Sequence, residues 1–214
     1  MAPRENQKSY ANIHTPWLRP IVTRKSGALA LHWLFQGLLY MDPTERWFKL
    51  GLDLLLTLVL GGILRLWLAL PLAIGGGFAV AHSLNFLFNG QMYGVLKTFG
   101  TVSHSGATFN AELERLRARV TEEPCILYAA AYGSLARGEW SETSDLDVRV
   151  VRAPGFRSAW RVCWFAARER ARAFLKRFPL DIYVLDGHFS LEKMSEKSIP
   201  IVLINDSGQA SEQR

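Results

Sequence analysis

Cysteines, secretion signals and repeats are scarce or missing in this chain, and each absence excludes a class of protein. The two cysteines, Cys125 and Cys163, form no CxxC pair, so neither a zinc site nor a disulfide framework is expected. The first dozen residues are polar, which argues against a cleavable signal peptide. The sequence shows no internal repeat, and its 49% hydrophobic and 21% charged residues exclude a disordered or fibrous protein.

Charge is almost absent from residues 47–96, whereas residues 107–214 are dense in arginine, glutamate and aspartate. The mean hydropathy of +0.06 therefore averages two unlike halves. The net charge of +6 is compatible with phosphate-bearing substrates, anionic lipid or nucleic acid, and it does not choose among them. We expect an apolar N-terminal part followed by a polar, globular part.

The first apolar helix has a recognisable start. Asp42 can cap it, Pro43 suits its first turn, and Glu45 lies three residues after Asp42, as in a capping box. The apolar run predicts a helix that continues to Pro71, where the missing backbone N–H would end it. After a very short turn, residues 72–96 predict a second helix, so that the two form a hairpin.

Length and aromatic placement favour a hairpin inside the membrane. Trp47 and Trp67 lie twenty residues apart, about 30 Å along a helix, so both rings can reach the interfacial belts of a bilayer. Residues 28–40 are too short to span and suit an interfacial or packed helix. Because Asp53 and Arg65 place charge within the first helix, a buried hairpin in a soluble protein and a hairpin in one leaflet are alternatives.

Polar residues also mark one face of the second apolar helix. His82, Asn85 and Asn89 recur at helical spacing, which predicts hydrogen bonds between helices or, alternatively, a polar groove for a lipid headgroup or partner.

Beyond a linker at residues 100–106, the pattern alternates between helices and strands. The predicted elements are a helix at 107–120, a strand at 126–131, a turn with a short helix, a strand at 146–151, a helix at 156–178, and strands at 180–185 and 199–204. The apolar stripe of the long helix comprises Phe156, Trp160, Cys163, Ala167, Ala171, Phe174 and Phe178. Its arginine stripe comprises Arg157, Arg161, Arg168 and Arg172. Such a stripe is typical of a solvated face paired with residues such as Glu169; phospholipid or acceptor binding is the alternative.

Two neighbouring carboxylates, Asp145 and Asp147, are the candidate metal ligands. Asp145 and Asp147 begin a strand, and alternate residues of a strand point to the same side, so their side chains project together with Cα atoms about 6–7 Å apart. Such a pair needs a neutralising cation, and carboxylate oxygens are what Mg²⁺ prefers. Asp181 can join them as general base or metal ligand if its strand lies alongside.

Gly133 and Ser134 follow the strand before this pair and open a short helix. Glycine lets the backbone approach a phosphate closely, backbone N–H groups hold the anion, and the Ser134 hydroxyl adds a donor. A phosphate cradle beside a metal-binding pair suits nucleotidyl transfer, in which metal ions bridge triphosphate oxygens and stabilise the leaving pyrophosphate.

The segment GSLARGEWSETSDLDVRVV resembles the signature of the DNA polymerase β-like nucleotidyltransferase superfamily, particularly its minimal members. The matching positions are Gly133-Ser134, Ala136-Arg137-Gly138 and Ser144-Asp145-Leu146-Asp147. The resemblance covers residues 107–186 and implies an NTP such as ATP as donor and Mg²⁺, expected as two ions, held by Asp145, Asp147 and Asp181. It also implies that Gly133, Ser134, Arg137 and Ser144 bind the nucleotide, although Arg137 can alternatively cap the loop.

The predicted organisation has three parts. Residues 1–42 are a polar segment with a short interfacial helix, 43–99 a transmembrane helical hairpin, and 107–206 a nucleotidyltransferase domain of the α+β class with a mixed sheet. We expect a membrane-anchored, metal-dependent nucleotidyltransferase that transfers NMP from an NTP to a hydroxyl of a lipid, glycan precursor or protein. Nucleic acid is not the expected partner. Alternatives are an antitoxin-type enzyme that modifies a partner protein, and a non-catalytic nucleotide-binding subunit.

The catalytic domain is expected to be cytoplasmic, because NTP is cytosolic and a two-helix hairpin returns the chain to its starting side. Arg46 and Lys49 before the hairpin and Lys97 after it agree with the positive-inside rule.

Overall fold

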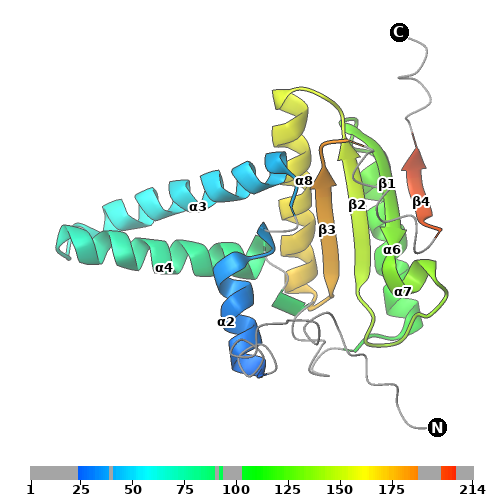
Figure 1. Ribbon diagram of the computed structural model, residues 1–214, viewed down its shortest axis with the longest axis horizontal. Helices are drawn as coiled ribbons and strands as arrows, with labels where there is room; N and C mark the ends of the chain where they lie inside the picture. Colours follow the sequence, from blue (N-terminus) through cyan, green and yellow to red (C-terminus); the bar gives the residue numbers. More distant parts are fainter. Residues whose placement is uncertain (1–23, 39–40, 90–91, 94–102, 188–198, 206–214) are drawn as a thin grey trace, which may run out of the picture.

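The computed structural model describes residues 24–38, 41–89, 92–93, 103–187 and 199–205 (Figure 1). Its helices are α2 (Lys25–Phe35), α3 (Pro43–Leu64), α4 (Leu70–Asn89), α6 (Gly106–Thr121), α7 (Gly133–Ala136) and α8 (Phe156–Leu175). Its strands are β1 (Ile126–Tyr132), β2 (Leu146–Arg152), β3 (Leu180–Leu185) and β4 (Ile201–Asn205). Residues 1–23 of the expected polar segment, residues 100–102 of the expected linker, and Lys97 lie outside the described residues.

The fold class is confirmed: a mixed sheet with helices, preceded by two apolar helices. The strand order is β3-β2-β1-β4. β1 is antiparallel to β2 and β4, whereas β2 and β3 are parallel and are joined through α8. Helices α6 and α8 pack on one face of the sheet, where Phe109, Leu116, Val148, Val162 and Ile182 belong to one buried core.

Helices α3 and α4 form a hairpin that projects from the rest of the molecule (Figure 1). The two helices cross closely at glycines, since a Cβ on Gly77 would lie 2.6 Å from the backbone nitrogen of Gly61. The predicted end of the first helix at Pro71 is wrong. α3 ends at Leu64, and Pro71 lies in the first turn of α4, where its missing N–H costs no helical hydrogen bond.

The outer surface of this hairpin is apolar and exposed. Both helices are long and apolar enough to cross a membrane, judged by length and composition. A core helix of a soluble protein can pass the same test, but such a helix is mostly buried. Here Trp47 is 72% exposed, Leu58 64%, Trp67 73% and Leu72 65%, so the described part of the chain does not cover these side chains.

Helix α8 differs from its prediction in length and in the direction of its apolar stripe. It ends at Leu175, where the turn is closed by a backbone hydrogen bond of 2.8 Å from Phe178 to Ala173. Cys163 faces the core, but Phe156 and Trp160 at the start of the stripe are 85% and 57% exposed. The apolar stripe therefore turns from the core onto an outer surface.

Candidate active site

One end of the sheet gathers the residues singled out in the sequence. Tyr132, the last residue of β1, pairs with Asp147 of β2, and Asp147 is in register with Asp181 of β3. Because neighbouring strands lie about 4.8 Å apart, Gly133, Asp147 and Asp181 meet at this end. Asp145 stands two residues before Asp147, on the loop that enters β2.

The backbone conformation and the surroundings of Gly133 both require glycine at this position. Its φ is +73°, which L side chains rarely adopt, and a Cβ built there would lie 2.2 Å from Oδ2 of Asp147. The backbone after β1 therefore closes directly onto the carboxylate. Any other residue at position 133 would displace Asp147.

The loop residues take different positions around this point. The Oγ of Ser134 is buried and has no hydrogen-bond partner among the described residues, although buried hydroxyls normally have one. Arg137 ends α7, and its Nε lies 2.8 Å from Glu139. The hydroxyl of Ser144 accepts a hydrogen bond of 3.0 Å from the backbone N–H of Ser141 and thus shapes the turn before Asp145.

The donor chemistry at this end of the sheet suits a divalent cation. No group of three or more His, Cys, Asp or Glu side chains in the described part of the chain is arranged as a complete metal site. Mg²⁺, however, is commonly held by one or two carboxylates together with substrate phosphates. Asp145 and Asp147, with Asp181 in register, fit that requirement, and the Ser134 hydroxyl, next to Gly133 in the chain, is a buried polar group that has no hydrogen-bond partner among the described residues.

Arg149 is a further charged residue at this end of the sheet that was not among the predicted site residues. It follows Asp147 by two residues on β2, so it lies on the same side of the sheet. Its guanidinium donates to the backbone oxygen of Asp181 at 3.2 Å and stands 4.4 Å from the ring centroid of Tyr183. Arg149 continues the two-residue spacing of Asp145 and Asp147, so the same strand alternation predicts that it shares their side of the sheet. There it places a positive charge beside the carboxylates.

The root of the hairpin, where α3 begins at Pro43 and α4 ends at Asn89, supports the strand that carries Asp181. β3 is the edge of the sheet, and its backbone is bonded by side chains from helices. Glu45 of α3 accepts a hydrogen bond of 2.7 Å from the N–H of Val184, and Arg170 of α8 donates to the carbonyl of Ile182. Glu45 and Arg170 also pair with each other, and both are almost fully buried.

The start of α3 is tied to the end of the same strand. The predicted side-chain cap by Asp42 is absent; its carboxylate instead accepts the N–H of Asp186 at 2.9 Å. Asp186 in turn accepts the backbone N–H of Thr44 at 3.2 Å and the Nε of Arg152 at 2.8 Å. Burial raises the pKa of Asp186, but these hydrogen bonds outweigh burial and hold its pKa below the usual range.

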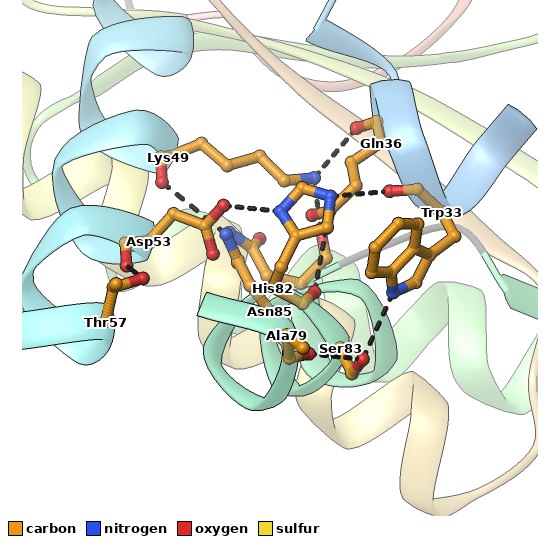
Figure 2. A network of polar contacts seen from close by, with 10 residues as sticks. Trp33, Gln36, Lys49, Asp53, Thr57, Ala79, His82, Ser83 and Asn85 are labelled. Carbon is orange, nitrogen blue, oxygen red and sulfur yellow. Dashed lines mark hydrogen bonds and ion pairs between the residues drawn. The ribbon is translucent and has the colours of Figure 1, made fainter. Parts of the chain in front are cut away.

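A network of polar contacts continues from the root into the hairpin (Figure 2). Lys49 is buried and donates a hydrogen bond of 2.8 Å to the backbone oxygen of Gln36. The positive-inside argument needs Lys49 to face the lipid headgroups, and in this structure it does not. Asp53 Oδ2 lies 2.5 Å from Nδ1 of His82, whose Nε2 lies 2.8 Å from the backbone oxygen of Trp33. The polar residues of the two apolar helices thus bond one another away from the outer surface.

Comparison with known proteins identifies the part of the chain that holds this site. Residues 113–199 match the family model described as "Nucleotidyltransferase domain". Residues 113–199 are a nucleotidyltransferase domain. The match covers less than half of the chain, contains every site residue predicted above, and leaves the hairpin outside. The predicted resemblance is therefore confirmed over this range. No curated protein and no solved structure matches the chain.

Proposed function

We propose that the protein is a membrane-anchored, Mg²⁺-dependent nucleotidyltransferase that moves NMP from an NTP such as ATP to a hydroxyl acceptor. The observation that carries this proposal is the meeting of Gly133 and Ser134 with the Asp145, Asp147 and Asp181 strands at one end of the sheet. The nucleotidyltransferase domain supports the reaction class. The use of Mg²⁺, the membrane anchor and the hydroxyl acceptor are proposals that go beyond the reaction class.

In the proposed reaction, the Ser134 hydroxyl donates a hydrogen bond to the triphosphate, and Arg137 and Arg149 offset the negative charge of the triphosphate. A divalent cation held by Asp145 and Asp147 would neutralise phosphate oxygens and stabilise the leaving pyrophosphate. Asp181 accepts the proton of the acceptor hydroxyl. The oxygen of that hydroxyl forms a bond to the α-phosphorus while the bond to the bridging oxygen breaks, and pyrophosphate leaves.

The anchor rests on the hairpin. At 22 residues, α3 is about 33 Å long, close to the hydrocarbon thickness of a bilayer. The exposed rings of Trp47 and Trp67 lie near its two ends, where interfacial tryptophans are enriched. A two-helix hairpin returns the chain to its starting side, so the catalytic domain and the cytosolic NTP share one compartment. An acceptor attached to the membrane, as a lipid, glycan precursor or protein, fits this location.

Release of pyrophosphate tests the proposal. Detergent-purified full-length protein is supplied with each nucleoside triphosphate, Mg²⁺ and native membrane extract, beside a D145N/D147N double variant. We expect Mg²⁺-dependent release by the native protein and none by the variant, with labelled nucleotide recovered in the lipid or protein fraction. Nucleotide binding without release in complete extract would instead indicate a non-catalytic subunit. Modification of a single soluble partner would indicate the antitoxin-type alternative.

A further inference from the structure

Helix α8 lies across the root of the hairpin (Figure 1), and three of its large aromatic side chains are exposed. The ring of Phe48 on α3 packs against Trp160 and Trp164 of α8, with centroid distances of 5.2 and 6.0 Å. Both tryptophans nevertheless remain 57% and 44% exposed, and Phe156 at the start of α8 is 85% exposed. Exposed aromatic residues gathered in this way mark an interaction surface.

Exposed positive charge lies beside these rings. Arg157 and Arg168 are exposed and share one side of α8 with Phe156, Trp160 and Trp164, within an arc of about 120° at 100° per residue. These five residues form the outer face of α8. A merely solvated helix face would account for the arginines but not for the aromatic rings beside them.

We infer that the outer face of α8 rests on the phospholipid headgroup layer and that anionic lipids are its partner. This inference rests on the membrane anchoring in the proposed function. The outer face is continuous with the exposed apolar surface of the hairpin, because Phe48 joins the two and Trp47 is 72% exposed beside it. With the hairpin along the membrane normal, α8 lies in the membrane plane (Figure 1).

The chemistry of the outer face matches that layer. Tryptophan is enriched where a bilayer meets water, because its ring is apolar and its N–H is polar. Arginine side chains near an anionic leaflet are attracted to its negative surface charge. The strands run beside α8 (Figure 1), so this contact holds the active-site end of the sheet at a fixed height above the membrane. Two contacts, the hairpin and α8, fix the orientation of the domain, whereas the hairpin alone would let it swing.

Site-specific fluorescence tests the contact in the full chain. Single cysteines are placed at Arg168 on the outer face, at Glu114 on an exposed position of α6, and at Leu58 on the hairpin. The background is Cys125→Ser; Cys163 is left because burial raises its pKa to about 12. Each protein carries an environment-sensitive dye in phosphatidylcholine vesicles with or without phosphatidylglycerol.

We expect headgroup-attached nitroxide to quench the dye at position 168 several-fold more than at 114, with a larger difference in phosphatidylglycerol vesicles. A dye at 168 that is as open to an aqueous quencher as the dye at 114 would overturn the inference. The inference would also be overturned if, in lipid-free detergent, the dye at position 168 became more shielded from the aqueous quencher as the protein concentration rises. That result would show that a second copy of the protein covers the outer face of α8. Quenching of position 58 by acyl-chain nitroxide reports the anchor separately, and pyrophosphate release reports catalysis, so the three failures are distinguishable.

Discussion

The contact between Gly133 and Asp147 makes Gly133→Ala the sharpest test of the site. The methyl group would stand 2.2 Å from Oδ2 of Asp147 and 3.2 Å from its Cγ. Atoms in ordinary contact lie more than 3 Å apart, so the carboxylate oxygen must retreat by about 1 Å. The backbone would also hold alanine at a φ of +73°, which costs about 1–2 kcal/mol.

Two effects of different size follow from this geometry. The free energy of unfolding should fall by about 1–2 kcal/mol, which a folded domain commonly tolerates. The rate of nucleotidyl transfer should fall by about 100-fold, because a misplacement of about 1 Å in a catalytic group has that consequence. The affinity for triphosphate should change less than the turnover number.

Gly155→Ala is the matched control. Gly155 also has positive φ, +98°, but a Cβ there would meet nothing within 4 Å, and it lies at the start of α8. Steady-state pyrophosphate release and thermal unfolding are measured for both variants. Gly155→Ala should lose stability and keep its turnover number. Equal loss of activity in the two variants, or full activity of Gly133→Ala, would refute the reasoning.

Three further predictions concern the hairpin and its root. Gly77→Leu should separate the two apolar helices and lower the melting temperature in detergent, because its Cβ meets the backbone of Gly61 at 2.6 Å; Gly75→Leu, with nothing within 4 Å, should not. Glu45→Gln leaves a buried arginine without its counter-charge and should lower the free energy of unfolding by about 3–5 kcal/mol in denaturant titrations, and a change below about 1 kcal/mol would contradict the pairing. Because the pKa of Asp186 is lowered by folding, its contribution to stability is present above about pH 4 and is lost as pH falls further. Asp186→Asn should therefore flatten the acid side of the stability profile, and an unchanged profile would exclude that contribution.

The arrangement of residues at the proposed catalytic end of the fold could be predicted because its signals are local. Asp145 and Asp147 were selected by strand alternation, and the same two-residue spacing would have selected Arg149. Asp181 needed one tertiary assumption, that its strand lies beside β2, and the parallel pairing supplies it. The close approach of Gly133 to Asp147 has no local signal, since it depends on how the end of β1 meets β2.

The root of the hairpin could not be predicted for the opposite reason. The three-residue spacing between Asp42 and Glu45 predicts a helix cap for Glu45. The partners of Glu45, Arg170 and the N–H of Val184, are more than a hundred residues away, and no sequence period connects them. The aromatic residues at the start of α8 have a helical period that predicts an apolar face, but a period cannot say whether that face meets a core or a membrane.

Because Glu45 of α3 and Arg170 of α8 bond the backbone of β3, the hairpin also stabilises the edge of the sheet. A chain shortened to begin at α6 would lose the acceptor for the Val184 N–H and uncover the guanidinium of Arg170, which is almost fully buried in the intact protein. Its sheet would then end in an open strand able to pair with other molecules. Removing the apolar hairpin to obtain a soluble protein should therefore give a protein that self-associates, and the intact chain in detergent or lipid is the form in which Glu45 and Arg170 cover the β3 edge.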